Sequence, residues 1–112
     1  MEIHGTQRGT VLVFAVTGRI DTLTAPQLND FLSAQIAAGQ HRFIADLSAL
    51  DYTSSAGLRV LLGAVKAVRQ HGGDLRLAAV QTGVGKGLEM SGFTSILKNY
   101  PTVDAAVASF GA

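Results

Sequence analysis

The chain has 112 residues, a length typical of one domain, so we expect residues 1–112 to fold as a single unit. Nine Lys and Arg residues nearly balance eight Asp and Glu residues, and the formal net charge of +1 lacks the basic excess with which proteins hold a nucleic-acid backbone. The absence of cysteine excludes disulfides, thiolate zinc sites and cysteine nucleophiles.

The first part of the sequence predicts two strands and a helix. Arg8-Gly9 is typical of a tight turn between two extended segments. The second segment, 10–17, is rich in β-branched and aromatic residues, which indicates a strand buried on both faces. Thr24 is expected to cap a helix, because Gln27 follows three residues later in a capping-box pattern, and Gly39 is expected to end that helix.

The rest of the chain alternates strands and helices. The apolar residues of 55–70 recur at helical spacing and predict a long helix. Gly63 inside this helix costs about 1 kcal/mol relative to alanine, which suggests close packing there. The residues between 47 and 55 are interpreted as a short polar stretch. The other predicted elements are strands at 42–47, 75–80 and 95–97, a weak helix at 83–90 and a last helix opened by Pro101 and Thr102.

This order of elements predicts an α/β fold. We expect a mixed, mostly parallel sheet of four to five strands with about four helices. Right-handed crossovers place the helices after the second and third strands in a single layer on one face of the sheet.

The segment 51–58 is the most informative of the chain, because it follows a strand and opens the long helix. It contains three consecutive hydroxyl residues, Thr53, Ser54 and Ser55. A serine here is first of all a helix N-cap, but one cap does not need three hydroxyls. Gly57 removes a side chain where another molecule could approach. A phosphoryl group on a serine here would meet the N–H donors and the positive end of the helix.

Two carboxylates follow predicted strands, at the edge where partners and ligands gather in open α/β sheets. These are Asp21 and Asp46. Either carboxylate could instead accept hydrogen bonds from the N–H groups of its own loop. Asp21 is more open to a functional role, because it precedes a loop rather than a long polar turn.

The residues do not indicate an enzyme. His4, His41 and His71 fall in expected turns and element ends, without the neighbours of a catalytic triad or a metal motif. The glycines of 83–87 fail both the Walker pattern and the dinucleotide pattern, since Lys86 is followed by glycine. We therefore expect no catalytic residue, no cofactor and no metal.

The sequence gives no sign of a membrane or export segment. Residues 1–7 lack the basic and apolar regions of a secretory signal. The longest purely apolar run, 11–16, is much too short to span a bilayer. We expect a cytoplasmic protein without direct membrane insertion that is a monomer when free.

Several segments occur in the order of a known family. Residues 17–21 match its Gly-x-x-Asp signature after the second strand, 44–48 match its strand ending in Asp-Leu-Ser, and 52–61 match its loop–helix signature. Gly72-Gly73 before Leu75-Arg76-Leu77, and Met90-Ser91-Gly92-Phe93, complete the order. Over essentially its whole length the chain resembles a STAS domain, in particular a bacterial anti-sigma factor antagonist, and the resemblance implies the STAS fold.

The resemblance also implies a function and a set of partners. In this family an anti-sigma factor serine kinase of the histidine-kinase-like ATPase type phosphorylates the loop–helix serine, and a serine phosphatase reverses the modification. The unphosphorylated antagonist binds the kinase and displaces the sigma factor, whereas the phosphorylated form is released. By position the phosphoacceptor is Ser55. Ser54 stands where many antagonists have Asp and is the second candidate.

The implied partner-binding surface combines the loop after the second strand with the loop–helix segment. It comprises Asp21, Thr22, Tyr52, Thr53, Ser54, Ser55, Gly57, Leu58 and Arg59. Our preferred hypothesis is a partner-switching regulator without catalytic activity. The alternatives are a STAS subunit of an ABC-type lipid-transport complex that is not phosphorylated, and a partner switch whose output is something other than a sigma factor.

Overall fold

One mixed sheet organises the part of the chain that the computed structural model describes, which is residues 1–90, 92 and 95–111. The elements are β1 (Glu2–Arg8), β2 (Val11–Ile20), α1 (Ala25–Ala37), β3 (Arg42–Asp46), β4 (Leu50–Thr53), α2 (Ser55–Arg69), β5 (Asp74–Ala78), α3 (Thr82–Met90), β6 (Asn99–Tyr100) and α4 (Val103–Ala108). The strand order is β1-β2-β3-β5-β6, and β4 pairs with β2. Strands β1 and β2 are antiparallel, and the other described pairs are parallel. The predicted α/β fold with a mostly parallel sheet is confirmed.

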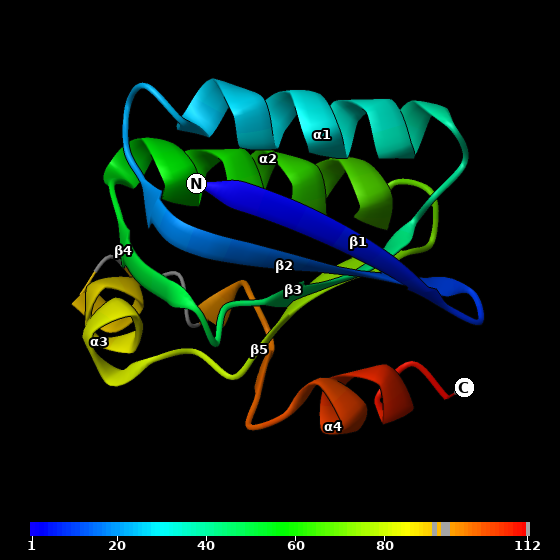
Figure 1. Cartoon of the computed structure of the whole chain (residues 1–112). Helices are drawn as coiled ribbons and strands as arrows, with labels where there is room; N and C mark the ends of the chain where they lie inside the picture. Colours follow the sequence, from blue (N-terminus) through cyan, green and yellow to red (C-terminus); the bar gives the residue numbers. More distant parts are fainter. Residues whose placement is uncertain (91, 93–94, 112) are drawn as a thin grey trace.

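Helices α1 and α2 lie side by side on one face of the sheet, as the right-handed crossovers predicted (Figure 1). Strand β2 serves a core on each face, because successive side chains of a strand point in opposite directions. Leu12 and Phe14 belong to the main core beneath α1 and α2. Val11 and Val13 belong to a smaller core with α4. The prediction of a strand buried on both faces is therefore confirmed.

Strand β4 occupies the stretch for which no secondary structure was predicted. It has four residues and pairs with the last part of β2, from Gly18 to Ile20. Gly18 has a left-handed backbone (φ 90°), and the register shifts between Gly18 and Arg19. This irregularity lets β2 run past residue 17, its predicted end. With β4 the described sheet has six strands instead of four to five, and β4 leads directly into α2.

The C-terminal part differs from the prediction at one strand. The prediction of a strand at 95–97 is wrong, because the strand that pairs with β5 is β6, at Asn99–Tyr100. The apolar character of Leu97, which suggested a strand, reflects the burial of its side chain in the main core. The expected start of the last helix is confirmed, since the Thr102 hydroxyl accepts a hydrogen bond from the Ala105 N–H at 3.0 Å. Of the motif at 90–93, residues 91 and 93 lie outside the described residues.

The packing of α2 corrects the expectation for Gly63. Gly63 is exposed, and a Cβ at this position would meet no atom within 4 Å. Close packing is found at Gly57 instead, in the first turn of the helix.

The helices of the described ranges are short. The longest, α2, has 15 residues, and α1 has 13. In these ranges we find no helix whose length and apolar character would let it cross a membrane.

Candidate functional site

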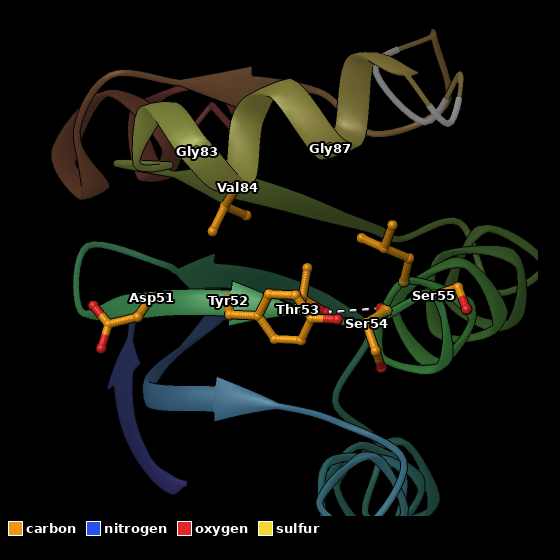
Figure 2. A pocket seen from close by; sticks show the side chains of 9 residues that line it. Asp51, Tyr52, Thr53, Ser54, Ser55, Gly83, Val84 and Gly87 are labelled. Carbon is orange, nitrogen blue, oxygen red and sulfur yellow. Dashed lines mark hydrogen bonds between the residues drawn. The ribbon is translucent and has the colours of Figure 1, made fainter.

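A cleft runs between α3 and the junction of β4 with α2. Figure 2 shows the two walls, with Gly83, Val84 and Gly87 of α3 facing Tyr52 and Thr53 of β4. The cleft has a volume of about 240 Å³. It is lined by Asp51, Tyr52, Thr53, Ser54, Ser55, Leu58, Gly83, Val84 and Gly87. The structure thus brings the predicted loop–helix residues together with α3, which confirms the weak helix predicted at 83–90 but was not expected to line a site.

Ser54 occupies the N-cap position of α2 but does not cap with its side chain. Its backbone is extended (φ −78°, ψ 171°), and its carbonyl oxygen accepts the Leu58 N–H at 3.2 Å. Its own N–H donates to the carbonyl oxygen of Ile20 at 2.8 Å, which ties the start of α2 to the end of β2. The Ser54 Oγ is buried and has no hydrogen-bond partner among the described residues. The plain N-cap interpretation therefore holds for the backbone position and fails for the hydroxyl.

Ser55 is the first residue of α2, and it is exposed. Its Oγ accepts a hydrogen bond from Nη2 of Arg59, one helical turn later, at 3.3 Å. Thr53 behaves differently, because its hydroxyl donates to the carbonyl oxygen of Ser54 at 3.1 Å, drawn as the dashed line in Figure 2. Of the three consecutive hydroxyl residues, Ser55 is exposed, whereas Thr53 and Ser54 are half-buried.

The space that Gly57 was expected to leave for another molecule is filled by side chains of the protein itself. A Cβ on Gly57 would collide with Oγ1 of Thr53 and would lie 2.7 Å from Cγ2 of Ile20. Gly57 is buried, and so is Leu58, whose side chain joins the main core. Glycine is therefore required here so that α2 can pack closely against β2 and β4. Gly57 has no side chain to present to another molecule, whereas Leu58, although buried, forms part of the lining of the cleft.

Thr24 stands at the N-cap position of α1, as expected, but its side chain does not cap the helix, and Asp21 supplies the side-chain acceptor instead. The Thr24 backbone is already helical (φ −96°, ψ −21°), and its side chain makes no cap hydrogen bond within the described residues. Oδ1 of Asp21 instead accepts the N–H groups of Leu23 and Thr24, both at 2.9 Å. The hydrogen bond from the Thr24 N–H is the main cause that lowers the pKa of Asp21 below its ordinary value.

Asp46 accepts a hydrogen bond from its own loop, which is one of the two roles considered for it. Its Oδ1 accepts the Ser48 N–H at 3.1 Å. Both carboxylates at the ends of strands are thus engaged by N–H groups of their own loops.

A second hollow joins the two parts of the predicted surface. It lies between the N-terminal halves of α1 and α2, with a volume of about 480 Å³, and we call it the α1–α2 groove. Its lining residues are Thr22, Ala25, Pro26, Asn29, Ala56, Arg59 and Val60. Thr22 and Arg59, predicted from separate segments, are therefore neighbours in space. Tyr52 is exposed on the other side of the α2 N-terminus, where the Arg19 guanidinium stacks over its ring at 4.5 Å from the centroid.

Comparison with protein families assigns the chain to one of them. The model of the STAS domain matches residues 2–106, so the chain belongs to the STAS domain family. Among its relatives, BtrV of Bordetella bronchiseptica, whose name is that of an anti-sigma factor antagonist, is 40% identical over 100 residues, which cover 89% of this chain and 86% of BtrV. The resemblance derived from the sequence motifs is thereby confirmed.

Solved structures with the same fold include two anti-sigma factor antagonists. One, from Mycobacterium paratuberculosis, has a TM-score of 0.88 and 26% identity, and the match covers 96% of this chain and 92% of the other. The other is SpoIIAA in its unphosphorylated form, with a TM-score of 0.84, 18% identity and coverage of 99% and 98%. SpoIIAA, a Bacillus cell-fate determinant, is also known in a phosphorylated form. At 18% identity the likeness to SpoIIAA establishes the fold alone.

Proposed function

We propose that the protein is an anti-sigma factor antagonist that works as a partner switch, with Ser55 as its phosphoacceptor. The observation that carries the proposal is the contrast between two adjacent hydroxyls at the start of α2. Ser55 is exposed, whereas the Ser54 Oγ is buried. The name of the 40% identical relative BtrV supports the general role, and the phosphorylated form of SpoIIAA, a protein of the same fold, supports the idea of phosphorylation.

The proposed modification is a phosphoryl transfer from ATP. The Oγ of Ser55 forms a bond to the γ-phosphorus, and the bond between that phosphorus and the β–γ bridging oxygen breaks. ADP leaves, and the hydroxyl proton passes to a base of the kinase or to water. The kinase is an anti-sigma factor of the histidine-kinase-like ATPase type, and a serine phosphatase removes the group by hydrolysis. This chain supplies the acceptor hydroxyl and no catalytic group.

Release of the partner is proposed to occur at the interface and not by unfolding. A phosphoryl group at a helix N-terminus is favourable, by about 0.3–1 kcal/mol for an exposed group, so α2 remains intact. The group adds about −1.5 to −2 charges and bulk to a surface that must lose its water on binding. Because residues 52–58 carry no charge of their own, this addition dominates the local potential.

The proposed docking surface is the exposed end of the molecule around the start of α2. Its accessible members are Thr22 in the α1–α2 groove, Tyr52 beside the cleft, and Ser55 and Arg59 between them. Asp21 and Gly57 support this surface by holding the starts of α1 and α2, and Leu58 connects the cleft to the main core. We further propose that the chain is a single domain that is monomeric when free and acts in the cytoplasm.

The test is a kinase assay with intact-protein mass spectrometry and peptide mapping. The wild-type chain, incubated with its cognate anti-sigma kinase and ATP, should gain one phosphoryl group, mapped to Ser55. Ser55→Ala should gain none, and the matched control Ser54→Ala should be modified like the wild type. Modification of Ser54 alone would move the acceptor, and a wild-type chain that gains no phosphoryl group would overturn the switch. An unmodified chain that instead co-purifies with an ABC ATPase would favour the transport role.

A further inference from the structure

Arg59 is distinguished from other arginines by its surroundings. Arg8, Arg69 and Arg76 each form an ion pair with an aspartate. Arg19 and Arg42 form no ion pair with a described residue, but each lies over an aromatic ring. Arg59 forms no ion pair with any described residue. Its recorded polar contact is the hydrogen bond from Nη2 to the Ser55 Oγ at 3.3 Å. Arg59 is also exposed, and it carries the only charge among the residues that line the α1–α2 groove.

We propose that Arg59 is the built-in partner of a phosphoryl group on Ser55, and that its charge at the α1–α2 groove is thereby neutralised when the chain is phosphorylated. This inference rests on the proposed function of Ser55 as the acceptor. Residues four apart on a helix face the same side, so the guanidinium reaches the acceptor without any change of the backbone.

The chemistry of the two side chains favours this pairing. A guanidinium presents a planar fork of N–H donors that matches the oxygens of a phosphoryl group. The present contact joins the guanidinium to one neutral hydroxyl oxygen at 3.3 Å. Phosphorylation replaces that hydroxyl by a group with three strong acceptor oxygens and about −1.5 to −2 charges, so the contact becomes a salt bridge.

The residue before the acceptor keeps Arg59 available for this role. A carboxylate at that position would compete for the guanidinium and would repel the phosphoryl group. This chain has Ser54 there, which is uncharged. The summed charge of residues 55 and 59 would therefore change from +1 to about −0.5 to −1 in a single modification. The only charge found among the described residues of the groove lining would then be paired with an anion at its rim, and both changes alter the same docking surface.

The test uses phosphoserine installed at position 55 during protein synthesis, so no kinase is needed and a failure of the proposed function is distinguished from a failure of this inference. The readout is the second pKa of the phosphate, followed by phosphorus NMR across pH 5–8 at an ionic strength of about 0.1 M, where charges more than about 10 Å apart are largely screened. A neighbouring cation favours the dianion and lowers this pKa. In Arg59→Gln the phosphate pKa should be about 0.5 unit higher than in the otherwise unchanged phosphorylated chain.

Two further variants make the result specific. Lys66→Gln removes the same charge from an exposed position of α2 that is 11 residues beyond Ser55, or about 16 Å along the helix axis, and should leave the phosphate pKa unchanged. Arg59→Lys should restore part of the shift, because lysine supplies the charge without the fork. Equal pKa values in the Arg59→Gln and unsubstituted chains would overturn the inference, and so would equal effects of Arg59→Gln and Lys66→Gln. Matching circular dichroism spectra establish that the variants are folded.

Discussion

The starts of α1 and α2 are built in opposite ways. At α1 the Asp21 carboxylate accepts two backbone N–H groups and the Thr24 hydroxyl, so its side-chain cap is complete. At α2 the Ser54 hydroxyl has no described partner, and the Ser55 hydroxyl is exposed. Packing around Gly57, not a side-chain cap, holds the start of α2 in place. The difference teaches that the α1 start is capped by the protein itself, whereas no described side chain caps the first N–H groups of α2, as the proposed phosphorylation requires.

The largest effect on stability is expected from a substitution at Gly57, where the start of α2 depends on close packing. Gly57→Ala places a methyl group against Thr53 and the buried Ile20, so we expect a loss of about 2 kcal/mol in the free energy of unfolding, measured by urea denaturation. Gly63→Ala is the matched control on the exposed side of the same helix, and it should stabilise by about 0.5–1 kcal/mol. Equal effects of the two substitutions would contradict the account of the α2 start.

The cap of α1 should matter for stability in a way that depends on pH. Asp21→Ala is expected to lower the melting temperature at neutral pH, because two N–H groups lose their acceptor, and Asp21→Asn should retain much of the cap. The pKa of Asp21 is lowered in the folded protein, chiefly by the Thr24 N–H. Its contribution is therefore present above the unfolded-state pKa, about 3.9, and is lost as the pH falls through the lower folded-state value.

This pH dependence is measured by comparing thermal unfolding of the wild type and Asp21→Asn between pH 6 and pH 2. The stability difference between them should shrink as the pH falls below about 4, because the wild-type carboxylate becomes protonated. A difference that stays constant over this range would show that the charge of Asp21 does not stabilise the α1 start.

At α2 the corresponding substitution, Ser54→Ala, should have little effect on the free energy of unfolding. Replacing a serine at an N-cap by alanine ordinarily costs about 1 kcal/mol. Ser54→Ala should instead be neutral or stabilise by a few tenths of a kcal/mol, because the buried Oγ makes no hydrogen bond to a described residue. Denaturant unfolding of Ser54→Ala beside Asp21→Ala measures the contrast. A loss near 1 kcal/mol for Ser54→Ala would mean that the hydroxyl does act as a cap.

Elements with long, regular patterns could be predicted from the sequence. A short strand and the choice of a capping side chain could not, because they depend on contacts between a few atoms. Helix α2 was predicted to within one residue, because its apolar residues keep helical spacing over many turns. Strand β4 has four residues and depends on pairing with β2 beyond Gly18, which no local pattern reveals. Asp21 and Thr24 are both good cap residues, and only the backbone angles determine which of them caps α1. The predicted loop–helix segment does line a cleft, but the packing at Gly57 and the wall formed by α3 could not be inferred without the fold.

The central claim is that the exposed hydroxyl at the start of α2 is the switch, and binding to the cognate anti-sigma kinase tests it most directly. Calorimetry should compare the unmodified chain, the chain phosphorylated at Ser55, and Ser55→Ala, with circular dichroism to establish that all three are folded. We predict that the unmodified chain and Ser55→Ala bind with similar affinity and that phosphorylation weakens binding at least tenfold, or about 1.4 kcal/mol. Equal affinity of the phosphorylated and unmodified chains would contradict the account.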